Sequence, residues 1–184
     1  MSEAVDGRLE RIRVAMDTYQ GRLVRYAARI TGDIELARDV VQDTFLRLCR
    51  AQPEKTDGHM AAWLFRVCRN RALDVRKKEA ALTPLGDVET SALPRDRAPD
   101  PLAAVEQHEA ARRVLEALGQ LSPGQQEVLR LRYQEELSYK EISSVTGHSV
   151  GNVGFLIHTG ILRLRQQLNP ITAAEAGKGG RSDA

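Results

Sequence analysis

The chain has 184 residues, of which 42% are hydrophobic, 28% charged and 4% aromatic, and its formal net charge is +2. This composition is typical of a soluble globular protein with one domain or two small ones. The sequence has no apolar run near the roughly 20 residues that span a bilayer and no apolar signal segment at its start, which predicts a cytoplasmic protein without membrane insertion. Helix formers are plentiful and no alternating β-branched run stands out, so we expect an all-α fold.

The first expected helix covers residues 7–30. Its apolar residues recur every three or four positions, which predicts one buried stripe. The stripe consists of Leu9, Ile12, Met16, Tyr19, Leu23, Tyr26 and Ile30. Gly32 is suited to end this helix, and Asp33 is suited to cap a second helix that runs to about Arg50.

The second helix combines a buried stripe with an unusual opposite face. The stripe consists of Ile34, Ala37, Val41, Phe45 and Leu48. The opposite face mixes apolar and charged side chains, namely Leu36, Asp39, Val40, Asp43, Leu46 and Arg47. Apolar residues bordered by charges are typical of a protein-binding surface, although scattered exposed apolar residues are also common.

A third helix is expected over residues 61–78, after a polar loop at 51–59. Its core face consists of Leu64, Phe65, Cys68, Ala72 and Val75. Its polar face consists of Arg66, Arg69, Asn70, Arg76 and Lys77, with Trp63 at the edge. Residues 60–80 contain six basic and two acidic side chains. Such a face suits a polyanion, because cations contact phosphates while an amide and a ring can contact bases. The alternative is a basic face that only contacts water.

The sequence divides into two small helical domains joined by a flexible linker. Residues 81–103 contain several prolines and an excess of acidic residues, which predicts a flexible linker. The expected organisation is a first helical domain at 1–80, the linker at 81–103, a second domain at 104–169 and a disordered tail at 170–184.

The second domain shows the pattern of a helix-turn-helix. A helix at 105–118 precedes a second one, for which Ser122 is the N-cap, Pro123 the first residue and Gln125 the partner in a capping box. A short helix then ends at the turn 146–148, and Ser149 caps a last helix that runs to about Leu168. Two capped helices joined by a glycine turn are typical of DNA-binding helix-turn-helix motifs, although other helical hairpins share this spacing.

The four histidines and two cysteines form no cluster with metal-ligand spacing. Cys49 and Cys68 occupy apolar helical positions and are expected to be buried, reduced thiols. Glu35, Asp39 and Asp43 lie four residues apart, but acid–base or metal chemistry would need further groups converging from elsewhere. We therefore expect no enzyme activity and no cofactor.

The motifs resemble those of a known family. Residues 23–78 are similar to region two of bacterial RNA polymerase sigma factors, and residues 115–168 are similar to region four. The resemblance lies in Asp39-Val-Val-Gln-Asp-Thr-Phe45, Ala62-Trp-Leu-Phe-Arg-Val-Cys-Arg-Asn70 with Ala72-Leu-Asp74, Leu121-Ser-Pro, and Leu137-Ser-Tyr-Lys-Glu-Ile142. The short length and the two domains without a third between them resemble the extracytoplasmic-function (ECF) group.

The resemblance implies a factor that binds core RNA polymerase and directs promoter recognition, promoter opening and transcription initiation, for a stress- or signal-responsive set of genes. The implied polymerase contacts are Leu36, Asp39, Val40, Gln42, Asp43, Leu46 and Arg47. The implied contacts to the minus-ten promoter element are Lys55, His59, Trp63, Arg66, Arg69, Asn70, Arg76 and Lys77. Among these, Asn70 is the main candidate for a base contact, and Trp63 is a candidate for a base contact or for packing.

The last helix departs from the family pattern. Family members usually carry several Lys or Arg residues in its first two turns, whereas here none occurs before Arg163. The loss of phosphate contacts predicts weaker and less salt-dependent binding to the minus-thirty-five element. The candidate contacts to that element are Tyr139, Lys140, Ser149, Asn152, Phe155, His158, Thr159 and Arg163. The alternative for this helix is that Phe155 and Leu156 contact another protein.

Two further interpretations remain at this point. A helix-turn-helix regulator that binds DNA without polymerase would explain the second domain but would leave the exposed face of the second helix unused. The resemblance also adds an anti-sigma protein to the candidate partners, because such proteins often cover polymerase-binding surfaces in this family. The expected partners are therefore core RNA polymerase, promoter DNA and such a regulator.

Overall fold

The fold is known from a computed structural model, which describes residues 2–52, 58–82 and 112–168, with side chains from residue 7. Most of the expected linker and the whole of the expected tail lie outside the described residues. The last helix of the first domain does reach Leu82, two residues past the expected domain boundary.

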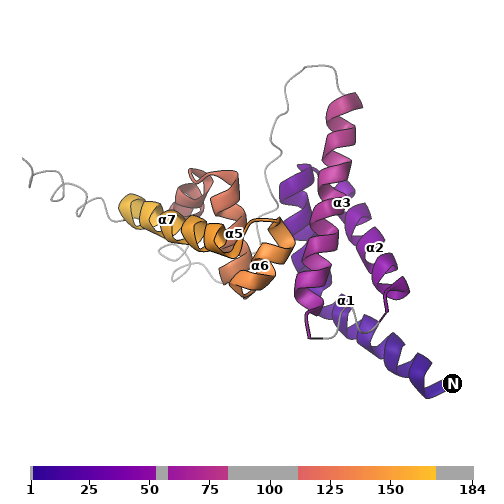
Figure 1. Cartoon of the computed structure of the whole chain (residues 1–184). Coiled ribbons are helices and arrows are strands. Elements are labelled where there is room, and N and C mark those ends of the chain that lie inside the picture. The colour runs from indigo at the N-terminus through magenta and orange to yellow at the C-terminus, as the bar shows by residue number, and fades with distance from the viewer. Residues whose placement is uncertain (1, 53–57, 83–111, 169–184) are drawn as a thin grey trace, which may run out of the picture. The chain divides into compact units, whose positions relative to one another are not determined.

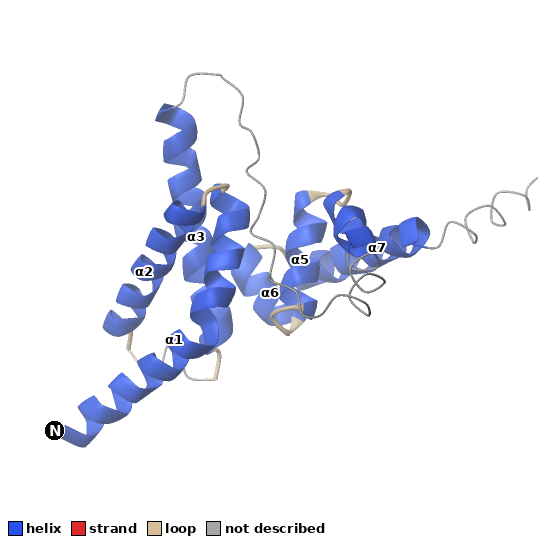
Figure 2. Cartoon of the chain, turned by 180° about the vertical axis from the view of Figure 1, so that it is seen from behind, coloured by secondary structure: helices blue, strands red, loops and turns tan. Residues whose placement is uncertain are grey.

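The described residues form helices and no strand, which confirms the all-α fold (Figure 1). In chain order the helices are α1 (Ser2–Thr31), α2 (Ile34–Arg50), α3 (Met60–Leu82), α5 (Pro123–Tyr133), α6 (Tyr139–Thr146) and α7 (Val150–Leu168). Residues 112–119 are also helical. Figure 2 shows the same helices from behind, joined by short loops where the chain is described.

The chain divides into two compact units. The first contains α1, α2 and α3 together with residues 140–147 of α6 and its following turn, and the second contains α5 and α7. In the first unit α1, α2 and α3 each pack against the other two. Its core is centred on Leu23, Leu64 and Phe65, all of them fully buried. The rings of Tyr26 and Phe65 meet edge to face with centroids 5.2 Å apart, a favourable arrangement for two aromatic rings.

The expected stripe on α1 is only partly buried. Leu23 and Tyr26 belong to the core, but Leu9 is 60% exposed and Met16 is 39% exposed, so the prediction is wrong for these two residues. Among the side chains described from residue 7 onward, Ala15 is buried in that half of the helix. A stripe is buried only where other helices cover it, and the periodicity of α1 alone does not show how far along it they pack.

α2 begins as predicted and buries more of its surface than predicted. Asp33 Oδ1 accepts hydrogen bonds from the backbone N–H groups of Glu35 and Leu36, at 2.7 and 2.9 Å. The predicted stripe is confirmed at Ala37, Val41, Phe45 and Leu48, which are all buried. Val40 is buried too, at 1% exposure, contrary to its expected place on the outer face. Because α2 packs against both α1 and α3, its buried face is wider than a single stripe.

The two cysteines have different environments. Cys68 is buried in α3, and burial raises the pKa of its thiol to about 12. Cys49 is free and exposed near the end of α2, so the prediction of two buried thiols is wrong for Cys49. Its neighbour in sequence, Leu48, occupies the core position instead.

The capping box of α5 is confirmed. Ser122 is the N-cap, and its hydroxyl accepts a hydrogen bond from the Gln125 N–H. In turn, the Gln125 side-chain oxygen accepts a hydrogen bond from the Ser122 N–H. α5 packs against α7 at Gly160, where an added Cβ would lie 2.9 Å from Leu129 Cδ1. A glycine at this position therefore lets the two helices approach closely.

The turn between α6 and α7 is also confirmed. Gly147 adopts a φ of 79°, a left-handed conformation that favours glycine, and its N–H donates to Ser143 O at 2.9 Å. Ser149 then caps α7 by accepting a hydrogen bond from the Asn152 N–H at 3.2 Å. The sequence of short helix, glycine turn and capped helix is the one predicted for the helix-turn-helix.

Candidate protein-binding and nucleic-acid interfaces

The outer face of α2 is smaller than the sequence indicated. Asp39, Gln42, Leu46 and Arg47 are exposed, and Leu46 is 54% exposed despite its apolar side chain. Leu36 is half-buried, and Val40 is in the core. The face that remains for a partner is therefore one exposed leucine surrounded by an acid, an amide and a cation, which favours contact with another protein.

Asp43 is already engaged within the first unit. Its Oδ2 lies 2.9 Å from Arg71 Nε on α3 and 3.6 Å from Arg47 Nη2 on α2. Both Asp43 and Arg71 are about one third exposed. Asp43 therefore links two helices, which limits what its carboxylate can offer to a partner. Sequence analysis missed Arg71 as the partner, because no local signal connects residues 28 positions apart.

The two faces predicted for α3 are confirmed except at Val75 and Arg69, which are both half-buried. Leu64, Phe65, Cys68 and Ala72 have no exposed surface. The opposite side carries four exposed polar residues, Arg66, Asn70, Arg76 and Lys77. Lys78, which the residue prediction left out, is exposed as well and extends this face. From residue 66 to residue 78 the polar face extends about 18 Å at a rise of 1.5 Å per residue.

The remaining candidates near α3 differ in accessibility. Trp63 and Arg69 are half-buried. His59 is exposed, and its carbonyl accepts a hydrogen bond from the Trp63 N–H at 2.9 Å, which places His59 at the start of α3. Lys55 lies outside the described residues.

The surface of α7 is largely uncharged over its first three turns. Ser149, Asn152 and His158 are exposed, and Phe155 is 64% exposed. No Lys or Arg occurs in α7 before Arg163. Thr159 is half-buried, and its hydroxyl donates to Phe155 O at 2.8 Å and accepts from Gln125 Nε2 at 2.9 Å. This hydroxyl is therefore already hydrogen-bonded within the domain.

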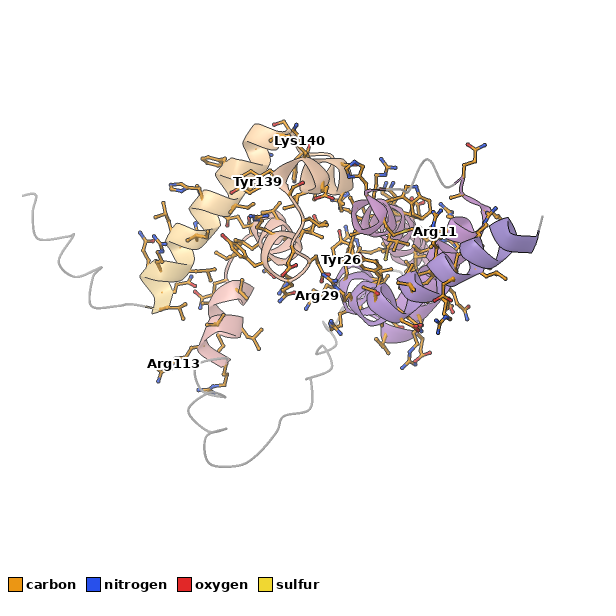
Figure 3. All side chains as sticks on the ribbon, turned by 90° about the horizontal axis from the view of Figure 1, so that it is seen from below. Arg11, Tyr26, Arg29, Arg113, Tyr139 and Lys140 are labelled. Carbon is orange, nitrogen blue, oxygen red and sulfur yellow. The ribbon has the colours of Figure 1, made fainter. Side chains whose placement is uncertain are left out.

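Tyr139 contributes an aromatic ring beside α7. The ring packs over Gly154, where an added Cβ would lie 3.6 Å from it, and the Arg132 guanidinium carbon lies 5.7 Å from the ring centroid. Figure 3 shows Tyr139 and Lys140 as consecutive side chains at the start of α6, and both residues are exposed. The tyrosine ring and Phe155 give this part of the surface an aromatic character.

Other site types find little support in the described part of the chain. It contains no group of three or more His, Cys, Asp or Glu side chains that could hold a metal ion. Of the acidic series on α2, Glu35 pairs with Arg38 and Asp43 pairs with Arg71. None of the described helices is long and apolar enough to cross a membrane.

Comparison with known families agrees with both units. Residues 15–81 match the model of sigma-70 region 2, and residues 111–164 match the model of sigma-70 region 4. The first match covers α2, α3 and much of α1, and the second covers α5, α6 and nearly all of α7. The exposed face of α2 and the cationic face of α3 thus both belong to the region 2 match.

Individual relatives align over most of the chain. The ECF RNA polymerase sigma factor SigL of Mycobacterium tuberculosis is 33% identical over 165 residues, which cover 87% of this chain and 90% of the relative. The RNA polymerase sigma-E factor of Streptomyces coelicolor is 32% identical over 152 residues, with 82% of each chain covered. The sigma factor CarQ of Myxococcus xanthus is 29% identical over 165 residues, which cover 85% of this chain and 92% of the relative.

A solved structure shows the same fold. CnrH, determined in complex with the cytosolic domain of CnrY, superposes with a TM-score of 0.56 at 27% identity and covers 92% of this chain and 95% of CnrH. The two region matches, the order of the helices and the identity to full-length relatives agree with one another. The chain belongs to the ECF group of RNA polymerase sigma factors, which direct transcription initiation at promoters.

Proposed function

We propose that the exposed face of α2 docks on core RNA polymerase and that the cationic face of α3 binds the minus-ten element as it opens. The observation that carries this proposal is the contrast between two faces of one unit. α2 exposes Leu46 among Asp39, Gln42 and Arg47, whereas α3 exposes cations and an amide. The first surface suits a protein and the second suits a nucleic acid.

The side chains of the α3 face support single-stranded DNA as its ligand. Promoter opening exposes unstacked bases, which proteins bind by stacking and by hydrogen bonds to base edges, while cations follow the backbone. Arg66, Arg76 and Lys77 supply the cations, and the exposed amide of Asn70 supplies both a donor and an acceptor for a base. Trp63 is half-buried, so one part of its ring packs in the domain and another part is accessible.

In this proposal α7 binds the upstream promoter element. Asn152 is exposed and offers an amide suited to an adenine edge, and the exposed Phe155 suits the methyl group of a thymine. Because this surface has no Lys or Arg before Arg163, its affinity depends less on phosphate contacts than is usual in the family.

A regulatory protein is the third proposed partner. CnrH, which shares the fold, was solved with the cytosolic domain of a second protein, CnrY. A protein that covers the exposed face of α2 would keep this chain from polymerase. The same likeness supports a cytoplasmic location. The chain acts as a non-enzymatic factor that determines which promoters the polymerase recognises.

The docking assignment is tested by mixing the purified chain with core RNA polymerase and measuring co-elution by gel filtration. Leu46→Glu places a charge on the exposed apolar position of α2 and should weaken binding at least tenfold, because hot-spot residues contribute about 2 kcal/mol or more. Val14→Glu is the matched control, because Val14 on α1 is similarly exposed at 52% and lies outside the region 2 match.

Each result separates the alternatives. Full binding by Leu46→Glu would remove the α2 docking assignment. If the wild-type chain did not co-elute with polymerase but bound DNA by itself, the result would instead support the interpretation as a helix-turn-helix regulator. Circular dichroism of both variants shows whether they keep their helices.

A further inference from the structure

A buried amide on α5 connects this helix to the outer part of α7. The side chain of Gln125 belongs to a residue that is only 4% exposed. Its Nε2 donates to Thr159 Oγ1 at 2.9 Å, and its Oε1 accepts from Arg163 Nη1 at 3.2 Å. The same Oε1 lies 3.2 Å from Ser122 Oγ and 3.3 Å from Ser122 N. One amide therefore joins the capping box of α5 to two residues one turn apart on α7.

The chemistry of its partners fixes the orientation of this amide. Arg163 can only donate hydrogen bonds, so it must meet the amide oxygen. The Thr159 hydroxyl gives its hydrogen to Phe155 O, or to Leu156 O at 3.3 Å, so toward Gln125 it must accept. A flipped amide would bring its NH₂ group against the guanidinium donors of Arg163. The arrangement thus has one favourable orientation, set by groups from both helices.

Arg163 is the first Lys or Arg of α7 and is exposed, although one of its nitrogens is bonded to Gln125. A guanidinium has five N–H donors in a rigid planar fork. The hydrogen bond from Nη1 to Gln125 restricts the fork, while the residue as a whole stays exposed. A long side chain that is restricted before binding loses less conformational entropy when it binds.

The position of Arg163 along α7 suggests what it contacts. Arg163 lies eleven residues after Asn152, which corresponds to about 16 Å along the helix axis. The major groove of B-DNA is about 12 Å wide. With Asn152 against the base edges and the axis of α7 inclined across the groove, Arg163 would lie at the phosphates of the groove border. Thr159 lies between these two residues with its hydroxyl already bonded to Gln125.

We propose that Gln125 is a positioning residue that holds Arg163 as the phosphate contact orienting α7 on promoter DNA. This contact takes over part of the role of the cations that are absent from the first turns of the helix. The inference rests on the proposed function of α7 as the helix that binds the upstream promoter element. Gln125 itself touches no DNA.

The experiment measures how promoter affinity of the complete holoenzyme depends on salt. The probe is a duplex fragment of source genomic DNA, whose promoter is located from the start site of a transcript made by this holoenzyme. Log affinity falls as log salt rises, and Arg163→Gln should make this negative slope smaller in magnitude by about 0.9, the value for one lost phosphate contact. Gln125→Met removes the amide at similar volume and should lower the slope by a comparable amount. The double variant should lose no more than Arg163→Gln alone.

A purely structural role for Gln125 would give a different pattern. Gln125→Met would then reduce thermal stability, leave the salt slope unchanged and add to the effect of Arg163→Gln. Gln126→Met is the matched control, because the Gln126 amide donates to Leu121 O at 2.9 Å and accepts from Arg130, both outside α7. This control should leave the slope at the wild-type value. If Gln125→Met fails to fold, Gln125→Ala is a second variant without the acceptor for Arg163 and should lower the magnitude of the slope in the same way.

Failure of this inference is distinguishable from failure of the proposed function. If Asn152→Ala and Phe155→Ala weaken promoter binding while Arg163→Gln leaves the slope unchanged, α7 binds DNA and Arg163 is not a phosphate contact. If none of these three changes affects binding, α7 does not bind this promoter, and the inference is overturned together with the proposal for α7.

Discussion

α3 and α7 are both assigned here to promoter DNA, and their surfaces differ. α3 exposes Arg66, Arg76 and Lys77 opposite a face that is buried from Leu64 to Ala72. α7 exposes Asn152 and Phe155 and has no Lys or Arg before Arg163. A cationic helix gains affinity from phosphates of any sequence and loses it in salt, whereas an uncharged surface depends on fitting particular base edges. The cations of α3 are thus suited to hold DNA of any sequence beside the base contact proposed for Asn70, and the uncharged surface of α7 is suited to select base edges.

The two helices also differ in how they are supported. The inner face of α3 is anchored by large apolar side chains such as Leu64 and Phe65. α7 packs closely on α5 through Gly160, and polar bonds from Gln125 hold its outer residues. Apolar burial tolerates many exposed side chains on the opposite face, but a polar network fixes particular ones. The contrast between the helices therefore extends from their surfaces into their interiors.

The largest expected effect comes from removing the exposed cations of α3. The variant Arg66→Ala/Arg76→Ala/Lys77→Ala should weaken promoter binding by the holoenzyme roughly 100- to 1,000-fold near 0.1 M salt, because each phosphate contact contributes about 0.9 to the salt slope. Polymerase binding should remain, because these residues lie on α3 and not on the exposed face of α2. Filter binding at several salt concentrations measures the affinity and the slope together.

The control for this variant changes exposed cations elsewhere in the first unit. Arg13 on α1 and Arg38 on α2 are exposed and pair with Glu10 and Glu35. Arg13→Ala/Arg38→Ala should keep nearly the wild-type slope. An equal loss in both variants would mean that overall charge, and not the face of α3, attracts the promoter.

A second prediction concerns the buried face of α3. Burial raises the pKa of Cys68 from its ordinary value of 9.0 to about 12, so the folded state keeps a neutral thiol while the unfolded chain ionises. This contribution to stability is fully present below pH 9 and is lost as the pH rises from 9 toward 12. At pH 10 the loss should be about 1.4 kcal/mol, since one pKa unit corresponds to about 1.36 kcal/mol.

Urea unfolding at pH 8 and pH 10 measures this loss. Cys68→Ala should remove it from the difference between the two pH values, while Cys49→Ala should not, because Cys49 is exposed. If both variants retained the wild-type pH dependence, the inner face of α3 would be open enough for a thiolate, and the contrast between its two faces would be weaker than we describe.

The parts of the fold that sequence predicted well depend on local signals. The side chains of Asp33, Ser122 and Ser149 each accept a hydrogen bond from a backbone N–H group within the next three residues. The inner face of α3 follows from periodicity, because its apolar residues recur every three or four positions and so form one side of a helix. Such features need only the neighbouring residues along the chain.

The features that sequence did not predict depend on packing partners distant in the chain. Val40 is buried because α2 touches two helices, and a single stripe assumes one. Asp43 is held by Arg71, and Gln125 reaches Thr159 and Arg163, which lie 34 and 38 residues further on. Side-chain type suggested an exposed binding role for Val40, Asp43, Thr159 and Arg163, but only the tertiary structure shows which side chains are buried and which polar atoms are already hydrogen-bonded.

The smallest expected effect comes from giving α7 a cation of the kind it lacks. Gly151 is exposed, and an added Cβ there would meet no atom within 4 Å. Gly151→Lys gains up to about 1 kcal/mol in helix propensity and loses about 0.3–1 kcal/mol by placing a cation at a helix N-terminus, so stability should hardly change. Promoter affinity near 0.1 M salt should rise about fivefold and the salt slope by about 0.9, if the new ammonium reaches a phosphate. Gly151→Gln, which has no charge, should leave the slope unchanged. An unchanged slope in Gly151→Lys would mean that the first turn of α7 stays away from the DNA backbone. The missing cations would then reflect a different position of α7 on the DNA and not a lower affinity in the same position.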